Sequence, residues 1–71
     1  MMDYVVIDGI RYEYSESDGT IEVSRDGDTI GIIHANEGDW ELILNGADPI
    51  KDGWEDGLGN SLSYDGWGSE F

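Results

Sequence analysis

Carboxylates make up almost all of the side chains that could do chemistry in this chain. Asp and Glu number 17, against the basic residues Arg11, Arg25 and Lys51, and the formal net charge is -14. Paired carboxylates can serve as general acid and base, but such a pair needs a cleft that frames a substrate, and a 71-residue chain has too small a core for a deep one. We therefore interpret these acids as solvated surface groups.

Other catalytic chemistry has no signature in the sequence. His34 is the single histidine, the chain has no cysteine, and no Gly-x-Ser-x-Gly motif is present. A lone histidine without such a partner supports no catalytic triad. We expect His34 to be a surface residue near a strand end, and we expect no catalytic residue, no cofactor and no enzymatic activity.

Two acid-rich segments, 26–28 and 52–56, raise the question of calcium binding. An EF-hand loop needs acids at positions 1, 3 and 5, a glycine at 6 and a glutamate at 12. Neither segment has that register, so no dedicated metal site is predicted. A weak divalent-metal-binding module stays open as an alternative.

Composition predicts a folded domain and not a disordered acidic tail. High net charge is typical of disorder, but 38% of the residues are hydrophobic and 11% are aromatic, and the β-branched residues follow strand periodicity. The N-terminus lacks a signal-peptide pattern, and no apolar stretch approaches the roughly 20 residues that span a bilayer. We expect one small domain, 1–71, with a cytoplasmic location.

The elements that must position these acids are mainly strands. Asp-Gly dipeptides, which favour tight turns, separate short segments that alternate apolar and polar residues. The predicted fold is mainly β (a small α+β fold stays open): an antiparallel meander of four to five strands over 1–45, with a short C-terminal helix or irregular segment packed on it. The five expected strands are 4–7, 10–14, 20–24, 29–34 and 40–44.

The segment 46–71 is expected to hold a short helix and an aromatic tail. Asp48 is a plausible N-cap with Pro49 at the first helical position, and an apolar stripe follows at Ile50, Trp54 and Leu58. Glycines within this segment weaken the helix. A final strand through 62–64 is a further expectation.

Strand alternation assigns each side chain to one of two faces. The core face is predicted to hold Ile10, Tyr12, Tyr14, Ile21, Val23, Ile30, Ile32, Trp40, Leu42 and Leu44. The outer face is predicted to hold Arg11, Glu13, Glu22, Ser24, Gly31, Ile33, Glu41 and Ile43.

The acids of the outer face and turns form the predicted partner-binding site. Residues two apart on a strand lie about 6.7 Å from each other, which is close to the spacing of phosphates along an extended nucleic-acid strand. Trp67 is added as an exposed tryptophan, since tryptophan is enriched at interface hot spots. The predicted site comprises Glu13, Glu22, Glu41, Asp18, Asp26, Asp28, Glu37, Asp39 and Trp67.

In size, acidity and lack of cysteine or catalytic signature, the chain resembles phage-encoded acidic decoy proteins, the DNA-mimic anti-restriction and small anti-CRISPR inhibitors. The resemblance covers the whole chain but lies in composition alone, because these families share no motif. It implies blockade of a basic nucleic-acid-binding protein, such as a CRISPR or restriction effector, in the host cytoplasm. Direct binding of nucleic acid or membrane is not expected from so acidic a chain.

A second interpretation explains the same acidity without a basic partner. In a halophile-adapted structural domain, surface carboxylates serve solvation, and the scarcity of lysine fits that setting. Such a domain would need molar salt to fold, whereas a decoy would fold in dilute buffer. The sequence does not predict an oligomeric state.

Overall fold

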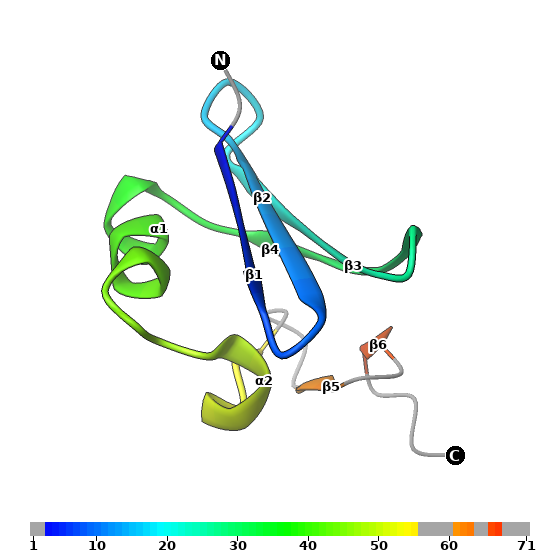
Figure 1. The fold of residues 1–71 in the computed structure, drawn as a ribbon. Coiled ribbons are helices and arrows are strands. Elements are labelled where there is room, and N and C mark those ends of the chain that lie inside the picture. Colours follow the sequence, from blue (N-terminus) through cyan, green and yellow to red (C-terminus); the bar gives the residue numbers. More distant parts are fainter. Residues whose placement is uncertain (1–2, 56–60, 64–65, 68–71) are drawn as a thin grey trace.

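The protein is a four-stranded antiparallel sheet with helix α1 packed on one face, seen in a computed structural model that describes residues 3–55, 61–63 and 66–67 (Figure 1). The strands β1 (Asp3–Ile7), β2 (Ile10–Ser15), β3 (Thr20–Arg25) and β4 (Asp28–His34) pair in sequence order. The predicted fold class, a mainly β meander with a short helical segment, is confirmed.

Two Asp-Gly turns set the hairpins at one end of the sheet. Asp8 and Gly9 connect β1 to β2 with φ angles of 53° and 80°, and Asp26 and Gly27 connect β3 to β4 with 54° and 89°. Positive φ at both central residues gives a turn whose twist matches that of the flanking strands, and Asp-Gly accepts these angles readily. The turns lie where the Asp-Gly dipeptides predict them.

A β-bulge in β4 reverses the faces predicted for the residues that follow it, Gly31 to Ile33, whereas Ile30 packs against the core as predicted. Ser24 pairs with Thr29, but Val23 pairs with Gly31, so Ile30 is an extra residue on β4. One extra residue moves every following side chain to the opposite face. Ile33 is therefore buried at 4% exposure, and Ile32 is exposed at 48%.

Residues 40–44, predicted as a fifth strand, belong to helix α1 (Glu37–Leu44), so that prediction is wrong and the meander ends at β4. Asn36 caps the helix: its Oδ1 accepts from the backbone N–H of Asp39 at 2.9 Å, and the Asp39 carboxylate accepts from the Asn36 N–H at 3.2 Å. This reciprocal capping box satisfies two N–H groups and starts the helix.

The helical period also changes which side chains of this segment are buried. Trp40 and Ile43, three residues apart, face the sheet and are buried. Leu42 and Leu44, predicted for the core by strand alternation, are each 54% exposed. Glu41 consequently lies on α1 and not on the outer face of the sheet.

The predicted C-terminal helix is present as α2 (Pro49–Asp52), with Asp48 as its N-cap and Pro49 in its first turn. It ends at Gly53, which has a left-handed φ of 69°. The stripe predicted through Leu58 thus ends early; Leu58 itself lies outside the described residues.

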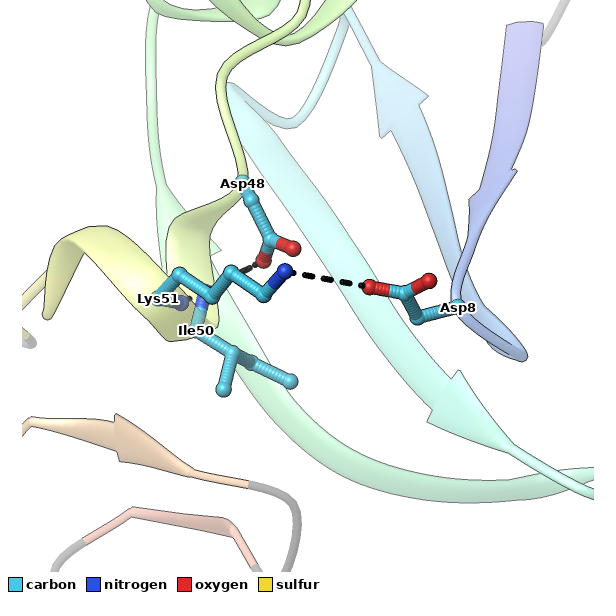
Figure 2. Close-up of polar contacts among 4 residues, drawn as sticks. All are labelled: Asp8, Asp48, Ile50 and Lys51. Carbon is cyan, nitrogen blue, oxygen red and sulfur yellow. Dashed lines mark hydrogen bonds and ion pairs between the residues drawn. The ribbon is translucent and has the colours of Figure 1, made fainter.

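Two capping hydrogen bonds begin α2, and one ion pair links it to the β1–β2 turn (Figure 2). The Asp48 carboxylate accepts from the backbone N–H of Ile50 at 3.1 Å and of Lys51 at 3.3 Å. The Lys51 Nζ lies 3.7 Å from the Asp8 carboxylate. Both ion-pair partners are largely exposed, so we assign this pair a small share of the stability.

The chain closes over the core with a second, two-stranded sheet, β5 (Leu62–Ser63) and β6 (Gly66–Trp67). The Leu62 N–H donates to the Trp54 carbonyl at 2.8 Å, and the Leu62 side chain is buried in the core. The strand expected through 62–64 is present for its first two residues, and Tyr64 lies outside the described residues. The described core comprises Ile10, Tyr12, Tyr14, Ile21, Val23, Ile33, Trp40, Ile43 and Leu62.

The bulge can be tested with two isoleucines that are adjacent in sequence. Ile33→Val removes a buried methylene and should lower the free energy of unfolding by about 1 kcal/mol, a shift of several degrees in Tm for a domain of this size. Ile32→Val, on the exposed side, should change it by less than about 0.5 kcal/mol. Thermal and urea unfolding measure both, and equal losses at the two positions would contradict the bulged register.

The capping box gives a second stability test. Asn36→Ala removes the side-chain acceptor at the start of α1 and should cost about 1 kcal/mol of unfolding free energy. Asn36→Ser, which keeps a capping oxygen, should recover most of that loss. If both variants unfold like the original chain, the cap does not contribute to stability.

Candidate functional site

The outer face of the sheet brings together two of the three strand acids predicted for it. Glu13 on β2 lies directly opposite Glu22 on β3. Like charges in this arrangement repel, and two neighbours offset the repulsion: the Arg11 guanidinium lies 3.5 Å from the Glu13 carboxylate, and the Thr29 hydroxyl donates to Glu22. These carboxylates are therefore engaged within the protein.

Apolar side chains share this face with the acids. Strand register aligns Tyr4, Glu13, Glu22 and Ile32 in one row across the sheet, and Tyr4 and Ile32 are exposed. The Arg11 guanidinium also lies 4.2 Å from the centre of the Tyr4 ring. The outer face is a mixed surface and not the continuous carboxylate array expected from the sequence.

The turn acids divide between the two ends of the sheet. Asp26 and Asp28 lie at the β3–β4 turn, whereas Asp18 lies at the β2–β3 turn and accepts from the Ser15 hydroxyl at 3.0 Å. Glu37 and Asp39 lie in the first turn of α1, which follows the end of β4. The Ala35 N–H donates to the Gly19 carbonyl at 2.9 Å, which holds the start of α1 near the β2–β3 turn.

A cavity of about 200 Å³ lies between α1 and the end of the sheet formed by the start of β1 and the end of β2. Four acidic residues line it: Asp3, Glu16, Glu37 and Glu41. Its remaining walls are Tyr14, Trp40 and Leu44. A water molecule occupies about 30 Å³ of the liquid, so the cavity can hold a side-chain head group.

The aromatic wall of this cavity is part of the core. Tyr14 on β2 and Trp40 on α1 stack with ring centres 5.5 Å apart and planes at 18°. Offset stacking of this kind stabilises a helix–sheet contact beyond simple area burial. Both side chains are buried, so the wall is fixed in position.

The electrostatic field in this region is negative. The pKa of the Tyr14 phenol is raised, first by burial and then by the carboxylates of Glu16, Glu37 and Asp39. None of the three basic residues of the chain lines the cavity. Arg11 and Lys51 are held elsewhere by Glu13 and Asp8. The lining of the cavity therefore contains acidic residues and no basic residue that offsets their charge.

The cavity includes two residues of the predicted site, Glu37 and Glu41, but sequence reasoning did not bring them together with Asp3 and Glu16. Glu37, Glu41 and Leu44 share a face of α1 because they recur at helical spacing. The spacing of Asn36 and Asp39, typical of a capping box, was the signal for that helix. Asp3 pairs with Tyr14, two residues before Glu16, through the β1–β2 register.

The remaining predictions for the site concern catalysis, metal and Trp67. His34 is exposed at the end of β4, as expected. Within residues 3–55, 61–63 and 66–67, no group of three or more His, Asp or Glu side chains is placed to hold a metal ion. In the same residues no helix has the length and apolar character to cross a bilayer. Trp67 lies in β6 opposite Leu62, and its side chain is outside the described part.

Comparison of the chain with protein-family models, with curated proteins and with solved structures gives no match.

The raised pKa of Tyr14 predicts a loss of stability in alkali. Above the ordinary tyrosine pKa of 10.0, the unfolded chain releases this proton while the folded chain keeps it. The contribution of this proton to the free energy of unfolding is therefore fully present below that pH. It is lost as pH rises through the folded pKa. Urea unfolding over a pH series should show a shallower alkaline loss for Tyr14→Phe than for the original chain. Tyr4→Phe, at an exposed tyrosine, is the control, and identical slopes in all three would contradict the assignment.

Proposed function

We propose that this protein binds the basic, nucleic-acid-binding surface of a partner protein and thereby competes with nucleic acid for it. The observation that carries the proposal is the acid-lined cavity beside α1, where four of the seven lining residues are acidic and none is basic. Acidic residues without a basic neighbour attract cationic groups, and the net charge of -14 extends that attraction over the whole surface.

The arrangement of the acids favours a protein partner. The carboxylates repel nucleic acid itself, whereas a groove of Lys and Arg that normally holds phosphates offers complementary charge. Acids occur at both ends of the sheet and along α1, so the protein presents negative charge over an extended area. A CRISPR or restriction effector is a partner of the required chemistry, as the compositional resemblance to phage decoy proteins implies.

The apolar residues around the acids supply a second component of binding. Tyr4, Val6 and Ile32 are exposed on the outer face, and Leu42 and Leu44 are exposed on α1. Charge gives fast, oriented encounter, and apolar contacts at the same surface slow dissociation. A purely solvating acidic surface does not need such residues beside its carboxylates.

The test is capture and identification of a partner in dilute buffer. The folded protein, immobilised and incubated with nuclease-treated lysate, should retain a nucleic-acid-binding protein. The purified partner should lose DNA or RNA when the acidic protein is added. Affinity should fall at least about tenfold between low and physiological ionic strength, because salt screens exposed charges.

Two results would overturn this proposal. The first is a purified partner that keeps its nucleic acid at saturating concentrations of the acidic protein. The second is a circular-dichroism spectrum that becomes folded only in molar salt, which would favour the halophilic structural domain.

A further inference from the structure

The two edge strands of the four-stranded sheet differ in how well they are protected. β4 carries the bulge at Ile30, and β6 lies beside it. β1 has neither feature: its register against β2 is regular, and within the described residues no strand pairs with its other side. Residues 4–7 of β1 also contain no charge and no proline. Bulges, charges and prolines are the usual protection of a sheet edge, so β1 presents an edge that is open to another strand.

The register shows which backbone groups of β1 point to this open edge. Ile7 and Ile10 flank the two-residue turn and form a hydrogen-bonded pair, and such pairs alternate along an antiparallel ladder. Val5 is therefore hydrogen-bonded to β2, whereas Tyr4 and Val6 direct their N–H and C=O groups away from it. An added strand can form hydrogen bonds with all four of these groups.

The side chains of Tyr4 and Val6 add an apolar component to the same edge. They are 58% and 59% exposed and lie on the outer face of the sheet. Val6 is opposite Arg11, whose guanidinium lies 4.2 Å from the centre of the Tyr4 ring. Because a cation is already present on this face, the side chains of an added strand that fit beside Tyr4 and Val6 are apolar.

The opposite side of this edge favours basic side chains. Asp3 begins β1 on the side of α1, where it lines a cavity together with Glu37 and Glu41 of that helix. Opposite charges paired across strands are favourable, and the net charge of -14 attracts basic segments over a longer range. The same net charge disfavours a second copy of this chain as the added strand.

We propose that the open edge of β1 binds an extended segment of the basic partner as an added antiparallel strand, with apolar residues beside Tyr4 and Val6 and basic residues on the side of α1. The inference rests on the proposed function and deepens it. In such strand addition, main-chain hydrogen bonds supply affinity and the alternating side chains supply specificity. The antiparallel direction continues the pattern of the sheet and is the more stable one per residue.

The first experiment uses a capped pentapeptide, Lys-Val-Arg-Val-Lys, which has the proposed alternation, and two N-methylated forms of it. When its valines lie beside Tyr4 and Val6, their N–H groups point to β1, and those of the basic residues point away. N-methylation of both valines should therefore weaken binding at least about tenfold, because two hydrogen bonds are lost. N-methylation of the arginine and the last lysine, the matched control, should change the affinity by less than about threefold.

Amide hydrogen exchange followed by ¹H–¹⁵N NMR reports the pairing directly, and shifts in the same spectra give the affinity. The Tyr4 and Val6 amides should exchange at least about tenfold more slowly with saturating peptide, because they become hydrogen-bonded. The Val5 amide, bonded to β2 in both states, should change little. The uncharged analogue Gln-Val-Gln-Val-Gln should bind at least about fivefold more weakly at low ionic strength.

The second experiment changes the protein at one position. Val6→Pro removes an N–H that β2 does not use, so it should weaken peptide binding at least about fivefold and leave the β1–β2 ladder in place. Val6→Thr, the control, keeps the N–H and the β-branched shape and should stay within about threefold of the original chain. Circular dichroism checks that both variants are folded. If Val6→Pro unfolds, the N-methylated peptides decide, because they leave the protein unchanged.

The results separate the edge site from the proposed function. Unchanged exchange at Tyr4 and Val6, equal binding of the two N-methylated peptides, or equal binding of the charged and uncharged peptides would each overturn the edge site. So would a dimer in sedimentation that Val6→Pro dissociates, because the edge would then belong to a second copy. If folded Val6→Pro displaces the partner from nucleic acid as well as the original chain does, the proposed function stands and the edge site is overturned. If the peptide binds as expected but no partner is displaced, the edge still binds a basic strand and the proposed function fails.

Discussion

The stacking of Trp40 on Tyr14 is the contact on which the rest of this structure depends. It joins α1 to the sheet, with ring centres 5.5 Å apart, and it places both side chains in a core that a chain of 71 residues can barely fill. The same contact forms the rigid wall of the acid-lined cavity. Because α1 is held at this point, Glu37 and Glu41 line the same cavity as Asp3, at the start of β1, and Glu16, just after β2. Folding and the candidate site thus share one interaction.

The acidity of the chain opposes its compact state, and the fold limits the cost by keeping charge out of the core. The described core contains only apolar and aromatic residues, and no buried charged residue is present among the described residues. The ion pairs of Arg11 with Glu13 and of Lys51 with Asp8 contribute little, since their side chains are exposed or only partly buried. Stability must come from apolar burial, from the strand ladders and from helix caps at Asn36 and Asp48. Unneutralised carboxylates remain at the surface, where a basic partner would relieve their mutual repulsion.

The four strands, their turns and α2 could be predicted because each depends on neighbours in sequence. Asp8-Gly9 and Asp26-Gly27 specify tight turns, alternation specifies strands, and Asp48-Pro49 specifies a helix start. The error at 40–44 has a local cause as well: Trp40, Leu42 and Leu44 alternate with Glu41 and Ile43 in a way that fits a strand. Only five residues long, this pattern also fits one and a half helical turns, and the capping spacing of Asn36 and Asp39 decides between them.

The sequence by itself determined the charge, the turns, the strand order and the presence of a short C-terminal helix. Only the tertiary structure decided which acids share a surface. Sequence alternation assigns Glu13, Glu22 and Glu41 to one face, but the structure leaves the first two opposite each other on the sheet and moves Glu41 to the cavity. It also buries Ile33 in place of Ile32. The physical reason is that a side chain's face depends on register against a partner strand or on packing of a helix. A single extra residue at Ile30, or a helix held by a distant tyrosine, changes that face without changing the local pattern.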